Sequence, residues 1–131
     1  MGMFYGHNQI SNSRVGELGL LYNMHTVLDS RNIAPVGCHI PTWTEINTLG
    51  TVLGGLSIAG GKLKEVGTIH WDSPNTGATD IYLFTAVGNG QRSGTDGTFG
   101  AIKQYGIHWS TTLNYTDFYR TFLLHYNSRE I

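Results

Sequence analysis

The sequence predicts a small α+β domain with short antiparallel strands, one main helix and long irregular loops. Eighteen glycines are spread from end to end, so they break the 131-residue chain into short pieces and exclude a helical bundle. Residues 42–53 have apolar side chains at helical spacing, and several short segments have the composition of strands. With 40% hydrophobic residues the chain can build one core, so we expect a single domain over residues 1–131.

The N-terminal part is expected to be mainly extended. Residues 19–29 are apolar and rich in strand-forming types, which indicates a strand followed by a short turn. Residues 32–41 read as an extended connector, because Pro35 and Pro41 each bias the preceding residue away from the helical region.

The main helix has clear signals at both ends. Thr42 is followed three residues later by Glu45, which is the pattern of a capping box. Gly54 and Gly55 supply a stop at the other end. We therefore predict a helix over about residues 42–53.

A long polar stretch punctuated by glycine follows the helix and predicts a loop scaffold rather than a catalytic motif. Gly60 and Gly61 are expected to reverse the chain, and residues 73–77 have the composition of a fixed turn. Trp71 and Phe84 are expected to anchor the stretch in the core.

The C-terminal half predicts three strands separated by loops. The strand candidates are residues 81–87, 106–112 and 118–126. The loops between them are residues 88–106 and 113–117.

Charge and hydropathy exclude two classes of partner. The formal net charge is −1 and the eight Lys and Arg residues are scattered, so we expect no binding to nucleic acid. The apolar runs are too short to cross a bilayer, so we expect no membrane insertion, and no signal peptide is visible.

Histidine and cysteine do not form a recognisable site. No two of the six histidines are spaced as metal ligands on a helix, which favours independent surface or core residues over a metal centre. Cys38 is the only cysteine, so an intrachain disulfide is excluded, and a small buried filler is favoured over a nucleophile. The histidines are His7, His25, His39, His70, His108 and His125.

The glycine-rich residues 88–97 lack the Gly-Lys-Ser/Thr ending of a phosphate loop. Asp96, Asn89 and nearby carbonyls have the hard oxygen ligands that calcium prefers, but a plain turn at Asp96-Gly97 is the favoured account. We therefore expect no cofactor, with calcium as the weaker alternative. Arg92 is expected to hold this loop by donating to its carbonyls.

The aromatic side chains have two interpretations. They either fill the core, which the pattern favours, or stack on sugar rings. The set consists of Trp71, Trp109, Tyr115, Phe118, Tyr119 and Tyr126.

Three ordered blocks, residues 19–49, 60–102 and 105–128, resemble the Fibrobacter succinogenes major paralogous domain. This resemblance implies a C-type lectin-like fold, in the branch that also holds formylglycine-generating enzymes and the variable proteins of diversity-generating retroelements. Members of this family occur mostly as surface or secreted modules of bacteria and in phage proteins. The resemblance therefore implies a role in adhesion or ligand display.

The chain departs from the family pattern at three places. Cys38 stands where the family usually has Trp, residues 1–17 show no clear strand pair, and the usual closing strand is not seen after residue 128. Because the terminal strands of this fold pair with each other, their loss would expose sheet edges. Rebuilt termini, a partner subunit that completes the sheet and a truncated module all remain open.

The resemblance and the residues together favour a non-enzymatic recognition or adhesion module that binds a glycan or a protein. A formylglycine-generating oxidase needs cysteines late in the chain, and none follows Cys38. We expect the ligand to meet the loops at residues 88–104 and 111–118, as in lectin-like folds. The expected ligand-binding residues are Asn89, Gln91, Asp96, Asn114, Tyr115 and Asp117, and the expected structural residues are Trp43, Trp71, Phe84, Arg92 and Trp109.

The alternative is a phage virion protein, such as a fibre, tail or head-decoration subunit, that acts through self-association. Exchange of a strand between subunits would satisfy an exposed sheet edge, so a homo-oligomer is expected there. Either function places the chain outside the cell, on a cell surface or on a virion.

Overall fold

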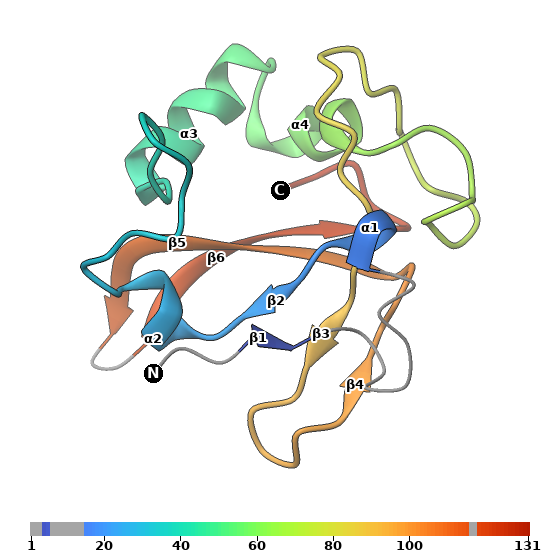
Figure 1. Cartoon of the computed structure of the whole chain (residues 1–131). Coiled ribbons are helices and arrows are strands. Elements are labelled where there is room, and N and C mark those ends of the chain that lie inside the picture. The colour runs from blue at the N-terminus through green and yellow to red at the C-terminus, as the bar shows by residue number, and fades with distance from the viewer. Residues whose placement is uncertain (1–3, 6–14, 116–117) are drawn as a thin grey trace. The chain divides into compact units, whose positions relative to one another are not determined.

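The computed structural model describes residues 4–5, 15–115 and 118–131 and contains short helices and three two-stranded sheets (Figure 1). This content agrees with the predicted α+β class. In chain order the elements are β1 (Phe4–Tyr5), α1 (Val15–Leu18), β2 (Leu21–Tyr22), α2 (Met24–Val27), α3 (Trp43–Val52), α4 (Leu56–Leu63), β3 (Gln91–Arg92), β4 (Phe99–Gly100), β5 (Tyr105–Tyr115) and β6 (Phe118–His125).

The chain divides into two compact units. Unit 1 comprises Met1–Ile46 and His108–Phe122, and unit 2 comprises Asn47–Ile107 and Leu123–Ile131.

In unit 1, β1 and β2 pair antiparallel, with Phe4 opposite Tyr22. The strand β1 lies in the N-terminal segment, where the sequence predicts no clear strand. The predicted strand over residues 19–29 is only partly correct, because the chain turns into α2 after Tyr22. Asn23 caps that helix by accepting a hydrogen bond from the backbone N–H of Thr26 at 3.0 Å.

Two tryptophans hold the β5 part of unit 1 to the N-terminal segments. The indole Nε1 of Trp109 donates to the carbonyl of Tyr22 at 2.9 Å. The backbone N–H of Trp43 donates to the hydroxyl of Thr112 at 2.8 Å, and the guanidinium of Arg120 lies 5.0 Å from the centre of the Trp43 ring.

The predicted main helix is present as α3. The backbone N–H of Thr42 donates to Glu45 Oε2 at 2.8 Å, and the N–H of Glu45 donates to Thr42 Oγ1 at 3.3 Å, so the capping box is formed. After Val52 the chain leaves the helix through Gly54 and Gly55, whose φ angles are 95° and 114°.

A second helix, α4, occupies the place where the sequence predicts a reversal at Gly60 and Gly61. That prediction is wrong, because both glycines lie inside the helix and are buried. A Cβ on Gly60 would collide with the carbonyl of Glu130, and one on Gly61 with the carbonyl of Gly77. These glycines therefore permit close backbone packing and do not mark a turn.

The predicted strand over residues 81–87 is also wrong. Residues 81–83 form a turn, and only Ala86 makes a bridge, which is parallel to Lys64. Leu83 and Thr85 have φ angles of 55° and 52°, in the left-handed region that an extended strand cannot use.

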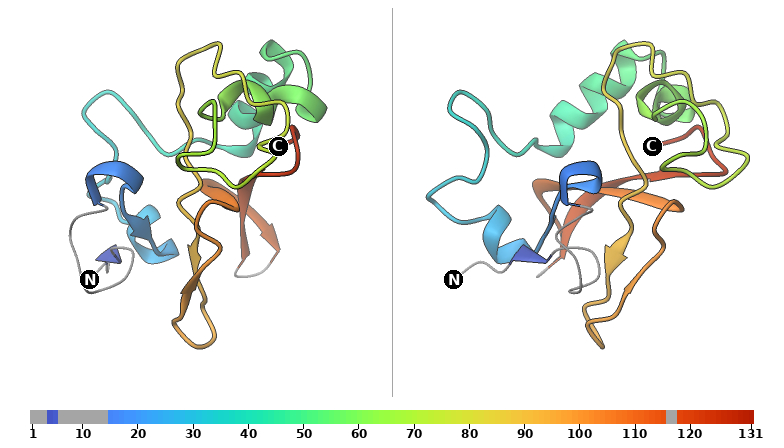
Figure 2. Two further views of the ribbon diagram at one scale, coloured as in Figure 1. Left: turned by 90° about the vertical axis from the view of Figure 1, so that its right-hand side faces the viewer. Right: turned by 45° about the vertical axis from the view of Figure 1, so that its right-hand side comes forward.

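The predicted loop over residues 88–106 contains a small hairpin. β3 and β4 pair antiparallel, with Arg92 opposite Phe99, and lie side by side in the views of Figure 2. The two long strands β5 and β6 agree with the sequence and run in opposite directions (Figure 1). β5 continues to Tyr115, so most of the predicted loop over residues 113–117 belongs to the strand.

Cys38 is exposed, which contradicts the predicted buried filler. The backbone N–H of Cys38 donates to the carbonyl of Pro35 at 2.8 Å, and its carbonyl accepts from the side chain of Asn32 at 3.2 Å. Both bonds involve backbone atoms of Cys38 and close a turn at the surface, where the residue is exposed.

Candidate functional site

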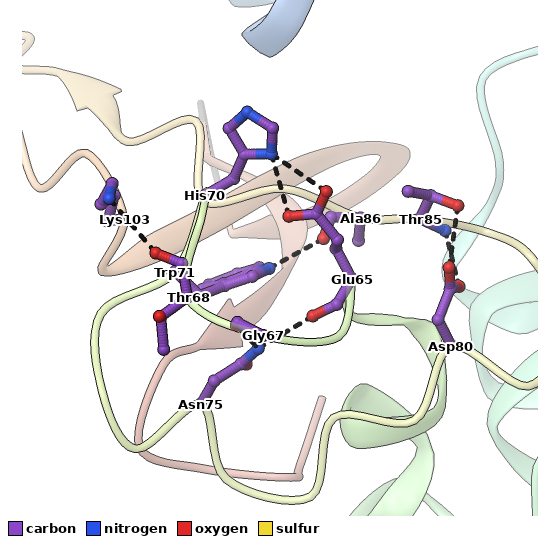
Figure 3. Close-up of polar contacts among 10 residues, drawn as sticks. All are labelled: Glu65, Gly67, Thr68, His70, Trp71, Asn75, Asp80, Thr85, Ala86 and Lys103. Carbon is purple, nitrogen blue, oxygen red and sulfur yellow. Dashed lines mark hydrogen bonds and ion pairs between the residues drawn. The ribbon is translucent and has the colours of Figure 1, made fainter.

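Unit 2 contains a loop scaffold built around Trp71, which is completely buried (Figure 3). The indole Nε1 of Trp71 donates to the carbonyl of Ala86 at 2.9 Å. The backbone of Ala86 also accepts from the N–H of Glu65 and donates to the carbonyl of Leu63, both at 2.9 Å. These bonds tie the end of α4 to the chain at Ala86.

Lys64 is a buried charge inside this scaffold. Its Nζ donates to the carbonyls of Thr76, His125 and Ser128 at 3.0, 2.9 and 2.7 Å. Burial lowers the pKa of Lys64 to about 8, so the side chain is still protonated at neutral pH. The three carbonyls supply the hydrogen bonds that a buried ammonium needs.

The turn predicted over residues 73–77 is fixed by Asn75. This residue is buried and has a φ of 46°. Its Nδ2 donates to the carbonyls of Glu65 and Gly67 at 2.8 and 2.7 Å, so the side chain joins two loops (Figure 3).

Residues 80–85 form a closed loop, called here the clamped loop. Asp80 accepts a hydrogen bond from the backbone N–H of Thr85 on Oδ1 and one from its hydroxyl on Oδ2, both at 2.8 Å (Figure 3). Asp80, Leu83 and Thr85 all have left-handed φ angles, between 44° and 55°. Left-handed φ is rare for a β-branched residue such as Thr85, and strain of this kind gathers at functional sites.

The clamped loop presents four consecutive apolar side chains to solvent. Ile81, Tyr82, Leu83 and Phe84 are 56%, 53%, 85% and 47% exposed. Phe84 is therefore not the core anchor that the sequence predicts. A strand would alternate its side chains between two faces, whereas the left-handed turn at Leu83 leaves all four exposed.

His70 and Glu65 form a hydrogen-bonded pair beside the scaffold. His70 Nδ1 lies 2.9 and 3.1 Å from the two carboxylate oxygens of Glu65, and both side chains are about one-fifth exposed. A carboxylate can orient a histidine base in this way, but none of the residues that the structure describes adds a nucleophile within hydrogen-bond distance of His70. The pair instead links the start and the end of the loop over residues 65–70.

Three of the predicted ligand-binding residues lie in or next to the β3–β4 hairpin. Gln91 is exposed, and Asn89 is half-buried. Hydrogen bonds from Ser93 and Thr98 lower the pKa of Asp96 to about 2. The Asp96 carboxylate thus shapes the turn, as the plain-turn interpretation expects.

Arg92, predicted to hold the same loop, crosses the hairpin. Its guanidinium lies 5.8 Å from the centre of the Phe99 ring on the paired strand. This is a cross-strand contact between side chains that supports the hairpin.

The other predicted ligand-binding residues belong to unit 1. Asn114 and Tyr115 are exposed at the end of β5, and Asp117 lies outside the described residues. Neither unit contains the whole predicted set, since Asn89, Gln91 and Asp96 belong to unit 2.

Sequence reasoning missed the clamped loop because its apolar run has the composition of a strand. The local signal was the pair Asp80 and Thr85 bracketing that run, since Asp readily bonds to nearby backbone N–H groups. The left-handed φ angles and the exposure of the four side chains distinguish the loop from a buried strand, and both are seen only in the structure.

Neither a metal centre nor a membrane-spanning helix is found among the residues that the structure describes. No three His, Cys, Asp or Glu side chains in this part of the chain are grouped so that they could hold a metal ion. Within the same residues, no helix has the length and apolar character needed to cross a membrane.

Comparison with known proteins places the chain in a family. The sequence model of the Fibrobacter succinogenes major domain matches residues 3–128. The chain belongs to this family. No curated protein and no solved structure matches it. The clamped loop and the Trp71 scaffold both lie within the part of this major domain that the family match covers.

Proposed function

We propose that this Fibrobacter succinogenes major domain is a non-enzymatic recognition module that binds a glycan or protein ligand through the clamped loop. The observation that supports the proposal is the set of four consecutive apolar side chains held outward on a closed loop. Exposed apolar surface of this kind marks interaction sites. A loop that is already ordered loses little entropy when it binds.

A binding role is favoured over catalysis because the polar side chains around the loop are used inside the protein. Asp80 bonds to Thr85, and His70 pairs with Glu65. What the loop offers to a ligand is therefore shape and apolar area, including the ring of Tyr82. Aromatic side chains of this type dominate the energy of many interfaces.

The proposal includes a C-type lectin-like fold and display on a cell or virion surface. One longer helix, short antiparallel strand pairs and long ordered loops support this fold. Exposed Gln91 in β3, and Asn114 and Tyr115 at the end of β5, are proposed as further contacts, each within its own unit. No cofactor is invoked, so EDTA should leave ligand binding unchanged.

The test uses the full chain, a glycan array and a displayed library of random peptides. Leu83→Ser should weaken binding of the selected ligands by about tenfold or more, because Leu83 is the most exposed apolar residue of the loop. Ile69→Ser is the matched control, since Ile69 is also exposed but lies outside the clamped loop. If no ligand binds, or if every ligand binds both variants equally well, the proposal is wrong.

A virion structural subunit that self-associates is the second candidate. Among the described residues, β5 and β6 form a sheet of only two strands. Part of β5 is already bonded to other segments, because the N–H of Thr111 donates to the carbonyl of Pro41 and the carbonyl of Tyr105 accepts from the N–H of Gly90. Where an outer edge of a two-stranded sheet is unpaired, a strand of another subunit can be added. Light scattering after size-exclusion chromatography distinguishes the candidates, because an obligate dimer or trimer without ligand favours the second.

A further inference from the structure

Arg120, in β6 of unit 1, is a half-buried cation without an ionic partner among the described residues. Its Nε is buried, and within the same part of the chain no hydrogen-bond acceptor is in reach of it. Unsatisfied buried groups are rare in folded proteins, and each calls for an explanation such as a functional role, a water or an ion. The burial of Nε also means that packing holds the base of the guanidinium in place.

The ring of Trp43 fixes the guanidinium further. Cζ of Arg120 lies over this ring, 5.0 Å from its centre. Trp43 is itself held, because its backbone N–H donates to Oγ1 of Thr112 on β5 at 2.8 Å. The face of an aromatic ring is no substitute for an oxygen acceptor, so this contact orients the cation and leaves its N–H donors for another group.

The charge of unit 1 matches a ligand with one negative charge. Arg31 and Arg120 are the Lys or Arg residues of unit 1 that the structure describes, and Arg31 is already paired with Asp29. A single guanidinium fits a carboxylate, whose two oxygens accept two parallel N–H bonds. A phosphate monoester carries almost twice that charge and usually meets several cations or a row of backbone N–H groups.

The acidic residue of α3 is used elsewhere. Glu45 follows Trp43 by two positions, so the two side chains do not face each other on the helix. One carboxylate oxygen of Glu45 accepts from the backbone N–H of Thr42, and the other lies beside Nε2 of His39, both at 2.8 Å. Glu45 therefore serves the start of the helix and not Arg120.

We propose that Arg120 and Trp43 form a binding site for the carboxylate group of a ligand. Because Nε is buried, the carboxylate meets the terminal nitrogens Nη1 and Nη2, while Trp43 keeps the guanidinium in position. A donor group that is held before binding loses little entropy when the ligand arrives. The site belongs to unit 1, so it is independent of the clamped loop in unit 2 and of the function proposed for that loop.

The test is a titration of the full chain with sodium acetate against sodium chloride at equal ionic strength, followed in proton–nitrogen NMR spectra. The Nε–H signal of Arg120 and the indole N–H signal of Trp43 should shift together, with a dissociation constant on the order of 10 mM. The indole N–H of Trp109 donates to the carbonyl of Tyr22 and should not shift. Glucuronate and N-acetylglycine then identify the source, since tighter binding of the first indicates a sugar acid and tighter binding of the second a peptide carboxyl terminus.

Three variants assign the binding to Arg120. Arg120→Gln should weaken acetate binding about tenfold or more, as seen at the Trp43 indole. Arg120→Lys keeps the charge but loses the planar pair of donors, so it should weaken binding about three- to fivefold. Arg31→Gln is the matched control and should bind acetate like the wild type, because the guanidinium of Arg31 is already paired with Asp29.

Other results would overturn the inference. If acetate shifts the two signals no more than chloride does, water satisfies Arg120 and there is no carboxylate site. Binding to Arg120→Gln that equals the wild type would place the acetate elsewhere, and the wild-type titration with Arg120→Lys still decides the matter if the glutamine variant does not fold. Asp117 is the acidic residue nearest to Arg120 in the sequence and lies outside the described residues. Tighter acetate binding by Asp117→Asn, by about tenfold, would show that the chain itself engages Arg120.

Discussion

Asp80 holds Thr85 by two hydrogen bonds, one to its backbone N–H and one to its hydroxyl, both 2.8 Å long. The bonds close the loop over residues 80–85 and keep Thr85 at a φ of 52°. A β-branched residue is seldom found in that conformation, so the clamp is what maintains it.

Removal of the clamp should loosen the loop without unfolding the protein. In Asp80→Ala the Thr85 N–H loses its acceptor, and because the loop is at the surface we expect little change in melting temperature. Hydrogen exchange should become about tenfold faster or more at the N–H groups of Leu83 and Thr85, which both donate to Asp80. Asp72→Ala serves as the control for loss of a nearby charge, and unchanged protection in Asp80→Ala would show that the clamp does not hold the loop.

Lys64 should contribute strongly to the stability of unit 2. Lys64→Met removes the shared donor of three carbonyls, of which that of His125 keeps a bond from the N–H of Ser128. We expect the free energy of unfolding to fall by about 3 kcal/mol. Lys62→Met is the matched control, because Nζ of Lys62 donates to one carbonyl, that of Leu53, at 2.7 Å, and should cost about 1 kcal/mol. Urea unfolding measures both, and equal losses would contradict this account of Lys64.

His108 should make the protein less stable in acid. Burial lowers the pKa of His108 to about 4 from the ordinary value of 6.5, and its ring stacks on Phe122 at a centroid distance of 4.4 Å. Because the unfolded chain takes up a proton at a higher pH than the folded chain, stability is complete above pH 6.5 and falls as the pH drops towards 4. The loss approaches about 3 kcal/mol near pH 4.

A variant without the imidazole isolates this effect. His108→Phe should show a flatter dependence of unfolding free energy on pH between 6.5 and 4.5 than the wild type. Glu45, with a pKa lowered to about 2 mainly by hydrogen bonds from Thr42, is stabilising above pH 4.5 and loses that effect as the pH falls through 2. Its titration therefore lies below this window, and an equally steep profile in His108→Phe would contradict the assignment.

The capping box should contribute to the stability of α3. Thr42→Ala removes the hydroxyl that accepts from the N–H of Glu45, and we expect a loss of about 1 kcal/mol. Thr51→Ala changes the same residue type near the end of the helix, where alanine is the better helix former, and should be neutral or slightly stabilising. Thermal unfolding of the two variants measures the difference.

A methyl group at Gly60 should be poorly tolerated. In Gly60→Ala the new Cβ meets the carbonyl of Glu130, so the C-terminal segment has to move away from α4, at a cost of about 2 kcal/mol. Gly94→Ala is the control, since its Cβ would meet open space. Comparable melting temperatures for the two variants would mean that the close approach at Gly60 is not needed.

Two predictions that agree with the structure depend on local signals. The capping-box pattern of Thr42 and Glu45 predicts the start of α3, and these two residues are three positions apart and contact each other directly. The strands β5 and β6 have the β-branched and aromatic composition of paired strands, so their existence follows from neighbouring residues.

Two features that the sequence does not reveal depend on residues far apart in the chain. Gly60 and Gly61 look like a helix stop but lie within α4, because residues 77 and 130 approach their backbone. The charge of Lys64 can be buried because carbonyls up to 64 residues away accept hydrogen bonds from its ammonium group.

By itself, the sequence determined the α+β class, the capped helix, the two long strands and the family, since each depends on local pattern or on the order of blocks. Only the tertiary structure decided which apolar residues are buried. Trp71 is in the core and Phe84 is at the surface, although both are aromatic residues of the same polar stretch. The reason is that burial depends on backbone conformation and distant partners, here the left-handed turn at Leu83 and the bond between Asp80 and Thr85.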